Sequence, residues 1–348
     1  MSLWVDKHRP KSLDHVDYHQ DISERFSALA ATGDLPHLLV YGPSGAGKKT
    51  RVMGLLKKLY GPSVEKISTK SHKFVTPSKR ELELGVICSA YHLEVTPSDM
   101  GNNDRLVIQQ LLKETAETQQ VDLNAKQRFK VVIINEADSL SRDAQAALRR
   151  TMEKYTKNIR LILLTNSTSN IIAPIRSRTL LVRVAAPTEQ DIVNVLEKVA
   201  AKEHVDLENT KTLEKIASHS DRNLRKALLT LETLYTFAGS KTVSENTPIP
   251  TPDWEMVIGR IARELVSSRT PATLLAIRSL FYELLSHCIP PSTILKELTY
   301  RLIPVVPANL RVPLISAAAT YEHRLKLGAK YIFHLEAFCA KVMVLLEE

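Results

Sequence analysis

The chain has 348 residues, of which 44% are hydrophobic and 24% charged, and its formal net charge is +9. This length allows two or three domains of ordinary size, and the composition is that of a soluble globular protein. No apolar stretch approaches the ~20 residues of a membrane-spanning helix, and the first residues contain no signal-peptide core, so we expect an intracellular protein that contacts no membrane. The positive charge suits a polyanionic partner, although excess charge also keeps proteins soluble.

The cysteines and histidines do not indicate a metal site. Cys88, Cys288 and Cys339 lie too far apart in the sequence for a metal pair and are too few for a disulfide framework, so we expect buried thiols. The eleven histidines show neither an HExxH spacing nor a pairing with CxxC. No zinc site is therefore expected.

Strand-like apolar runs alternate with helical patterns in the first half of the chain. The runs cover residues 38–41, 91–95, 131–134, 160–164 and 180–184. Alternation of this kind predicts a mostly parallel sheet with helices on both faces, and we assign residues 1–186 to this α/β domain. The segment RELELGVIC, residues 80–88, alternates in polarity and indicates an added hairpin beside the second strand.

Two helical regions follow the α/β domain. Pro187 and Thr188 mark a helix entry, and residues 187–240 form a small helical domain. A connector near residues 240–252, rich in proline and polar residues, separates it from a third region, 253–348, which is again helical. The apolar positions of this third region exceed what one small domain needs. Oligomer packing would use the surplus, and a monomeric helical domain is the alternative.

The segment GPSGAGKKT, residues 42–50, has the pattern of a phosphate-binding P-loop with one changed residue. In the motif GxxxxGK[ST], glycines let backbone N–H groups close on phosphates, the lysine reaches the terminal phosphates, and the hydroxyl holds Mg²⁺. Lys48 keeps its place, but Lys49 replaces the hydroxyl residue. Thr50 follows one position late, rotated by about 100° on a helix. A buried strand before the loop and an amphipathic helix after it favour a P-loop over a glycine turn without a ligand.

The segment VVIINEAD, residues 131–138, falls where an ATPase carries its acidic pair. Glu136 is in place to align an attacking water, but Asn135 stands where an Asp supports Mg²⁺. Lys49 adds a positive charge about where the metal would sit and replaces part of its charge. The sequence therefore predicts ATP or ADP binding with weakened Mg²⁺ ligation. The alternative for Asn135 is that it only ends a core strand.

Two amphipathic helices carry polar stripes beside their apolar faces. The members of the stripes are Arg105, Gln109 and Lys113 in the first helix, and Arg142, Gln145 and Arg149 in the second. Residues four apart share one side of a helix, so each stripe could follow a phosphate backbone. Aromatic residues do not interleave with the charges, which argues against base stacking. A solvated helix face is the ordinary alternative.

Together with WVDKHRP at the N-terminus and IRSRT at residues 175–179, these motifs resemble the AAA+ small subunits of eukaryotic replication factor C, the loader of the sliding clamp PCNA. The likeness covers essentially the full length, and it is strongest to the subunit with a GKKT loop at the end of the subunit arc. It implies an AAA+ domain, a helical lid and a C-terminal collar that holds five subunits together. It also implies a nuclear protein of DNA replication and repair.

The resemblance also assigns roles by motif. Asn166 matches the polar sensor near the terminal phosphate, and Arg178 matches an arginine finger for a neighbour's ATP, although a solvated charge is the simpler interpretation of Arg178 alone. Arg105 and Arg149 become candidate contacts to DNA phosphates. The residues that would contact nucleotide are Val5, Arg9, Val16, Asp17, Gly42, Pro43, Ser44, Gly45, Ala46, Gly47, Lys48, Lys49, Thr50 and the second sensor Arg225. The family's usual Tyr and Cys are replaced by His8 and Thr179.

Two functions compete at this point. In the first, the chain is a subunit of a heteropentamer that binds ATP or ADP, hydrolyses it poorly, and lends Arg178 to a neighbour. Its partners would be other replication factor C subunits, PCNA and double-stranded primer-template DNA, with alternative large subunits as further candidates. In the second, the chain is an autonomous P-loop ATPase acting on DNA, with Thr50 shifted to hold the metal. Glu136, Asn166 and Arg225 favour this second function.

Overall fold

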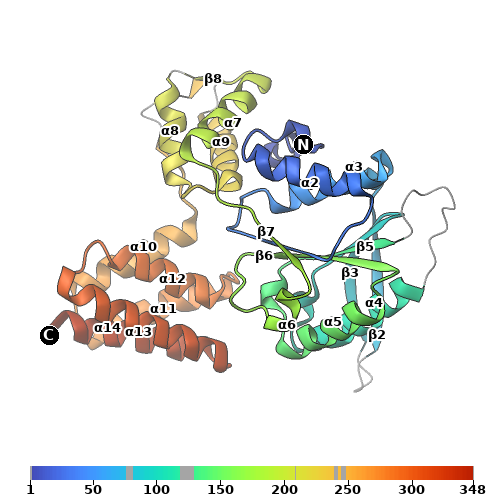
Figure 1. Ribbon diagram of the computed structural model, residues 1–348. Helices are drawn as coiled ribbons and strands as arrows, with labels where there is room; N and C mark the ends of the chain where they lie inside the picture. The colour runs from blue at the N-terminus through green and yellow to red at the C-terminus, as the bar shows by residue number, and fades with distance from the viewer. Residues whose placement is uncertain are drawn as a thin grey trace. The chain divides into compact units, whose positions relative to one another are not determined.

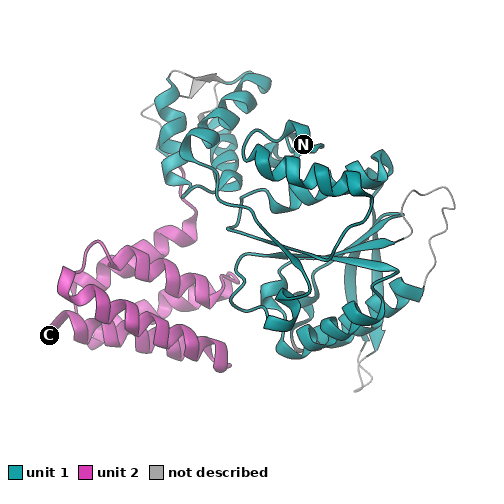
Figure 2. Ribbon diagram, in the orientation of Figure 1, with its two compact units in different colours: residues 1–249 teal, residues 250–348 magenta. Residues whose placement is uncertain are grey.

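The structure is a computed structural model that describes residues 2–75, 81–117, 129–207, 209–238, 242–243 and 248–347. It divides into two compact units, residues 1–249 and 250–348 (Figure 2). The first unit combines a sheet with helices, and the second is helical (Figure 1). The finer boundaries at 187–240 and 253–348 stay predictions, and residues 240, 241 and 244–247 of the predicted connector lie outside the described residues.

A seven-stranded sheet forms the centre of the first unit, in the order β2-β3-β4-β5-β6-β1-β7. Its parallel strands are β1 (Leu38–Tyr41), β4 (His92–Val95), β5 (Lys130–Ile134), β6 (Ile159–Thr165) and β7 (Leu180–Arg183). The antiparallel pair is β2 (Ser68–Val75) and β3 (Glu81–Cys88), and β3 lies antiparallel beside β4. The five predicted strands and the predicted hairpin are therefore confirmed.

Helices cover both faces of this sheet because its central strands are apolar on both sides. On one face, α2 (Gln20–Thr32) and α3 (Lys48–Tyr60) pack with Leu38 and Val40 of β1. On the other, α4 (Asp104–Glu117) and α5 (Arg142–Lys154) pack with Leu39. Successive strand residues point to opposite faces, so β1 supplies both cores. The short helices of this unit are α1 (Trp4–Lys7), η1 (Leu13–His15), η2 (Pro62–Glu65), η3 (Pro97–Asn103), η4 (Ala137–Ser139) and α6 (Ala173–Arg176).

A bundle of three helices completes the first unit. Its helices are α7 (Glu189–Lys202), α8 (Thr210–His219) and α9 (Leu224–Ala238), with the short strands β8 (Asp206–Leu207) and β9 (Thr242–Val243). The Thr188 hydroxyl accepts the N–H of Asp191 at 3.1 Å, and the Asp191 carboxylate accepts the N–H of Thr188 at 2.9 Å. This reciprocal capping box confirms the predicted helix entry.

The N-terminal segment shares the core of that bundle. Trp4 is buried among residues of α7, α8 and α9, and its ring lies 5.3 Å from that of Tyr235 between centroids. The N–H of Trp4 also donates to the Glu232 carboxylate at 3.0 Å. The first residues of the chain are thus fixed to its helical bundle rather than to the sheet.

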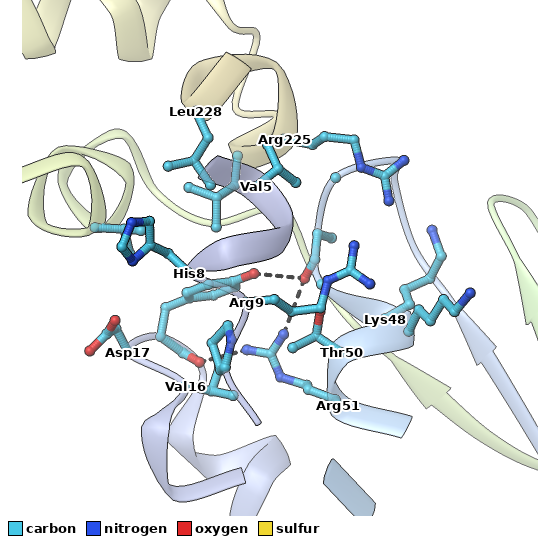
Figure 3. Close-up of a pocket in the computed structure, with 18 of the residues that line it drawn as sticks. Val5, His8, Arg9, Val16, Asp17, Lys48, Thr50, Arg51, Arg225 and Leu228 are labelled. Atoms are coloured by element: carbon cyan, nitrogen blue, oxygen red, sulfur yellow. Dashed lines mark hydrogen bonds between the residues drawn. The ribbon is translucent and has the colours of Figure 1, made fainter. Parts of the chain in front are cut away.

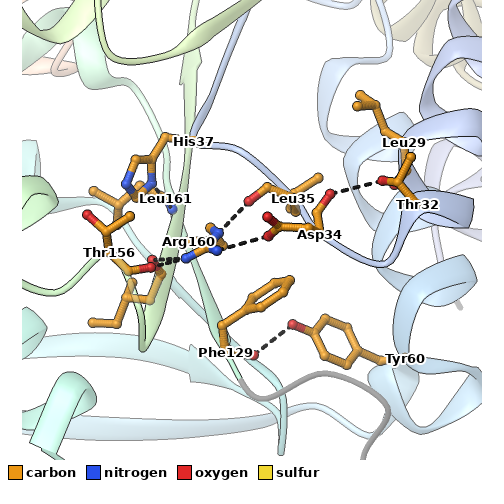
Figure 4. Close-up of polar contacts among 11 residues, drawn as sticks. Leu29, Thr32, Asp34, Leu35, His37, Tyr60, Phe129, Thr156, Arg160 and Leu161 are labelled. Carbon is orange, nitrogen blue, oxygen red and sulfur yellow. Dashed lines mark hydrogen bonds and ion pairs between the residues drawn. The ribbon is translucent and has the colours of Figure 1, made fainter.

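Arg160, at the start of β6, joins several loops of the α/β region (Figure 4). Its guanidinium donates to the carbonyls of Leu35 and Thr156 and forms an ion pair with Asp34 at 2.9 Å. It also lies over the ring of Phe129, with Cζ 4.8 Å from the centroid. Besides its carbonyl partners and the aromatic ring, Arg160 therefore has a carboxylate partner, Asp34.

His37 lies beside this network and is 8% exposed. Its Nδ1 accepts the N–H of Leu161 at 3.0 Å, which requires the ring to be neutral at that nitrogen. Burial, reinforced by the nearby guanidinium of Arg160, lowers the pKa of His37 from 6.5 to about 4. Because the folded protein holds the ring neutral, His37 links stability to pH.

The second unit is an all-helical domain. Its helices are α10 (Asp253–Ser267), α11 (Pro271–Ser286), α12 (Pro291–Leu302), α13 (Ala308–Leu327) and α14 (Tyr331–Glu347). Phe281 and Phe338 are fully buried in its core. The apolar surplus predicted from the sequence is visible as exposed side chains, including Leu275, Tyr282, Tyr300, Val312 and Leu327. No helix among the described residues is long and apolar enough to cross a membrane.

The prediction of three buried thiols is correct only for Cys339, which is fully buried. Cys88 is half-buried, and Cys288 is exposed. Cys288 follows the end of α11 in the turn before α12, with a φ of 59°, and turn residues lie at the surface. Sequence spacing excluded disulfides but carried no information on burial.

Candidate nucleotide-binding site

A cavity of about 910 Å³ lies in the first unit between the loop after β1, the N-terminal segment and the three-helix bundle (Figure 3). The predicted site residues that line it are Val5, Arg9, Val16, Asp17, Ser44, Gly45, Ala46, Gly47, Lys48, Lys49, Thr50, Glu136, Asn166 and Arg225, together with Asn135. Segments far apart in the sequence therefore meet at one place. Gly42 and Pro43 do not line the cavity, although both contact Lys48 through their carbonyls.

The loop requires glycine at two positions for different reasons. Gly45 has a φ of +76°, and a Cβ there would lie 1.8 Å from Oδ1 of Asn223, just before α9. Gly47 has a φ of +81° and immediately precedes α3, so the first N–H groups of that helix lie at the cavity. Helix N-termini bind anions through such groups and through the helix dipole. This arrangement suits phosphates.

Lys48 is held at the loop by three oxygen atoms. Its ammonium donates to the carbonyls of Gly42 at 2.6 Å and Pro43 at 2.9 Å, and to Oδ1 of Asn166 at 3.0 Å. Burial lowers the pKa of Lys48 from its ordinary value; the Asp138 carboxylate opposes this effect, and the Arg225 guanidinium reinforces it. The contact with Asn166 brings the ends of β1 and β6 together at the same ammonium.

Lys49 contacts a residue that the sequence reasoning missed. Its ammonium forms an ion pair with Glu94 of β4, whose side chain is only 6% exposed. The amide of Asn135 donates to the same Glu94 oxygen at 2.7 Å and to the Thr96 hydroxyl at 3.3 Å. Lys49 and Asn135, the two residues that depart from a metal-binding pattern, thus share one carboxylate. The signal in the sequence was an acidic residue within the otherwise apolar run YHLEV.

This cluster does not fit Mg²⁺. Around the carboxylate of Glu94, the protein presents the ammonium of Lys49 and the NH₂ group of Asn135, which are both donors. Mg²⁺ needs oxygen ligands in octahedral geometry, usually including a carboxylate. Among the described residues, no group of three or more His, Cys, Asp or Glu side chains could hold a metal ion.

The end of β5 is held close to the end of β6. Asp138 accepts the N–H groups of Asn166 at 3.1 Å and Ser167 at 3.4 Å. Glu136 is exposed at the cavity and has a φ of 49°, a left-handed conformation that is uncommon outside glycine. Such conformations cluster at functional sites, where surrounding structure holds them.

The N-terminal side of the cavity is fixed to both the loop and the bundle. Asp17 pairs with Lys198 of α7, and His8 contacts Glu203 at the end of the same helix. Tyr18 donates its hydroxyl to the carbonyl of Ala46 at 3.0 Å. Loop, N-terminal segment and bundle therefore form one connected wall of contacts around the cavity.

Three predicted functional residues lie outside the cavity. Arg178, between α6 and β7, is exposed, forms an ion pair with Glu153 of α5 at 2.8 Å and donates to the carbonyl of Pro174. Arg149 lies 3.7 Å from the same Glu153 carboxylate. Arg105 is exposed on α4. None of the three can contact a ligand of this cavity in the described arrangement.

The prediction of an exposed polar stripe is wrong for one of its residues, Gln145. Gln145 is 1% exposed rather than solvated. Its amide donates to the carbonyls of Leu140 and Asn170 and accepts the N–H of Ile172, so its polar atoms are satisfied inside the protein. A buried glutamine with paired polar atoms costs little. Arg105, Gln109, Lys113, Arg142 and Arg149 are exposed, as predicted.

Comparison with known proteins identifies the family. Over 348 residues, the chain is 60% identical to replication factor C subunit 5 of Neurospora crassa, covering all of this chain and 98% of that protein. It is 51% identical to replication factor C subunit 3 of Homo sapiens over 345 residues, or 99% of this chain and 96% of that one. The chain belongs to the replication factor C subunit family. As a replication factor C subunit, it has an AAA+ fold and binds nucleotide.

Family models match each part of this replication factor C subunit. Residues 254–348 match the C-terminal domain of replication factor C subunit 3, residues 194–236 match a lid domain described as RCF1/5-like and AAA+ ATPase, and residues 18–188 match the delta subunit of DNA polymerase III. A variant of RuvB from Thermotoga maritima has a similar fold, with a TM-score of 0.53 and 16% identity over 85% of this chain and 90% of that one. The predicted AAA+ fold class is confirmed.

Proposed function

We propose that this chain serves in a replication factor C clamp loader as a subunit that holds ATP or ADP and hydrolyses it poorly. Its family supports assembly with other replication factor C subunits and the loading of a clamp onto DNA. The observation that carries the nucleotide part is the contact of Lys49 and Asn135 with Glu94. The protein supplies its own ion pair at the place where a hydrolytic site needs a divalent cation.

Nucleotide retention and hydrolysis depend on different parts of such a site. Phosphates are bound by the N–H groups of the loop and by Lys48, and both are present at the cavity. Hydrolysis also needs positive charge that follows the transferring phosphoryl group, which Mg²⁺ supplies when it is bound. Lys49 does not provide that charge freely, because Glu94 neutralises it. The chain therefore keeps the binding parts and lacks a hydrolytic one.

Arg178 suits a role in a neighbouring subunit. It is exposed, lies outside its own cavity, and its ion pair with Glu153 is a solvent-exposed one of the kind that contributes little energy. Arg178 can therefore leave Glu153 for a phosphoryl group bound to another subunit at a small cost in free energy. An arginine finger contributes roughly 10³–10⁵ in rate to phosphoryl transfer.

The remaining partners follow from the same role. Arg105 and Arg149, exposed on the adjacent helices α4 and α5, suit contacts to the phosphates of double-stranded primer-template DNA, which carry no base sequence information. The clamp in this proposal is PCNA, and the compartment is the nucleus. Alternative clamp-loader large subunits are further candidate partners. The exposed apolar residues of the second unit suit packing between subunits.

The test compares two substitutions in the assembled complex. Arg178→Ala should lower the ATPase rate of the complex because one site loses its finger, whereas Glu136→Gln should leave the rate unchanged because this chain's own site contributes little. Arg176→Ala, an exposed arginine two residues earlier, is the matched control. A complex whose rate fell with Glu136→Gln, or was unchanged by Arg178→Ala, would contradict the proposal.

An autonomous P-loop ATPase acting on DNA is the second candidate. The position of Glu136 at the cavity and the contact of Asn166 with Lys48 favour it. In that case the isolated chain would hydrolyse ATP with Mg²⁺, and both Lys48→Ala and Glu136→Gln would abolish the activity. If the isolated chain binds ADP but does not hydrolyse ATP, the clamp-loader subunit is favoured over the autonomous ATPase.

A further inference from the structure

Arg51, in the first turn of α3, is a fully buried cation beside the nucleotide cavity (Figure 3). Its guanidinium donates to the carbonyl of Ala46 at 3.1 Å and to that of Tyr18 at 2.6 Å. It lies over the Tyr18 ring, with Cζ 4.5 Å from the centroid. In the part of the chain that the structure describes, no carboxylate forms an ion pair with it.

Arg160 shows what is unusual about this arrangement. Both arginines donate to backbone carbonyls and lie over an aromatic ring. Arg160 also pairs with Asp34 at 2.9 Å. Arg51 is more deeply buried than Arg160, and a buried charge without a counter-charge is costly. The missing counter-charge is what a phosphate group in the adjoining cavity would supply.

The charges around the cavity sharpen this argument. Lys48, Lys49 and Arg51 occupy the start of one helix, but Glu94 neutralises Lys49. The other two cations of that turn form no ion pair with a carboxylate among the described residues. Lys48 donates to two carbonyls and the amide oxygen of Asn166, and Arg51 donates to two carbonyls. A guanidinium stays charged at every physiological pH. Arg51 is therefore a permanent positive charge close to where phosphates bind.

Arg51 also orients the loop. The Ala46 carbonyl receives both the Arg51 guanidinium and the Tyr18 hydroxyl, so it points toward these two side chains. The planar trans peptide then directs the N–H of Gly47 the opposite way. A Cβ at Gly47 would lie 2.6 Å from the Tyr18 hydroxyl and 3.0 Å from Nη1 of Arg51, so the two side chains pack closely against the loop.

We propose that Arg51 is a positioning residue for a nucleoside di- or triphosphate bound without metal: it orients the Ala46–Gly47 peptide and supplies, from beneath the loop, positive charge that Mg²⁺ supplies in other P-loops. The proposal rests on the proposed function in that the cavity must bind nucleotide. Arg51 also joins the loop to the N-terminal wall of the cavity, because its partner Tyr18 directly follows the lining residues Val16 and Asp17.

The test measures the affinity of the full-length chain for ADP and for adenosine, with EDTA present, by calorimetry. Arg51→Met, which keeps an unbranched apolar stem but removes the charged guanidinium, should weaken ADP binding roughly tenfold or more and leave adenosine binding nearly unchanged. Arg51→Lys keeps a charge and should retain most of the preference for ADP. A purely structural role would weaken both ligands alike.

Arg160→Met is the matched control, because it removes an arginine of similar construction outside the cavity. It should lower the thermal stability and leave the ratio of ADP to adenosine affinity unchanged. If Arg51→Met shows the wild-type ratio, the proposal is wrong. If Arg51→Met does not fold, Arg51→Lys decides: a preserved ratio supports the proposal, and a roughly tenfold loss overturns it. A wild-type chain that binds neither ligand would instead overturn the proposed function.

Discussion

Replacing Lys49 by Thr and Asn135 by Asp should convert the internal ion pair into a site that requires a divalent cation. The double change removes the ammonium from Glu94 and puts a second carboxylate where Nδ2 of Asn135 now lies, 2.7 Å from Glu94 Oε1. Two carboxylates at that separation repel by about 6 kcal/mol at an effective dielectric constant of about 20. Protonating one of them at neutral pH limits the cost to about 4 kcal/mol.

The assay follows unfolding of the first unit in urea. The chain has two tryptophans, Trp4 in the first unit and Trp254 in the second, so a Trp254→Phe background leaves Trp4 as the reporter. In EDTA, the Lys49→Thr/Asn135→Asp protein should be less stable than the parent by up to about 4 kcal/mol. Millimolar Mg²⁺ should restore much of this difference and leave the parent unaffected.

A triple variant that adds Glu94→Gln provides the control. It has one carboxylate instead of two, so both the destabilisation in EDTA and the response to Mg²⁺ should be smaller. Equal stability of the double variant in EDTA and in Mg²⁺ would refute the reasoning, because it would mean that Glu94 and residue 135 do not share a charge site.

Two other perturbations test features of the same unit. Gly45→Ala should weaken ADP binding roughly tenfold, because its Cβ meets Asn223 and its φ of +76° disfavours alanine; adding Asn223→Gly should recover part of the loss, and no recovery would exclude the clash as the cause. His37 keeps a folded pKa of about 4 against 6.5 when unfolded, so its contribution is complete above pH 6.5 and declines as the pH falls toward 4. The urea assay should show a loss of about 2 kcal/mol between about pH 6.5 and about pH 5 that is absent in His37→Asn, and parallel pH profiles would contradict it.

The fold was predictable where one strong pattern decides it. Buried strands such as residues 131–134 are apolar throughout, and the capping box at Thr188 is local, so both were recognisable from the sequence. Helical spacing predicted the exposure of a polar residue less reliably. Gln145 is spaced like the exposed Arg149, and only the carbonyls and N–H groups of distant loops make its burial acceptable.

The sequence revealed which residues of the candidate site depart from the P-loop ATPase motifs. It did not reveal which other side chains contact them. Lys49 and Asn135 were visible because a motif defines what should stand there. Glu94 and Arg51 were not, because their partners depend on the register of β4 beside β5 and on the position of α3. The role of a polar side chain that faces the interior depends on its interaction partners, which can lie far away in the sequence.

The packing of Trp4 has a consequence for the synthesis of the protein. Its partner Glu232 lies 228 residues later in the chain, and the rest of its core comes from α7, α8 and α9. At about 5–20 residues per second, the ribosome takes roughly 10–50 s to make that stretch. The Trp4 side chain must therefore wait, exposed, until nearly the whole first unit has been translated. The cavity, which includes Val5 and Leu228, can close only after that delay.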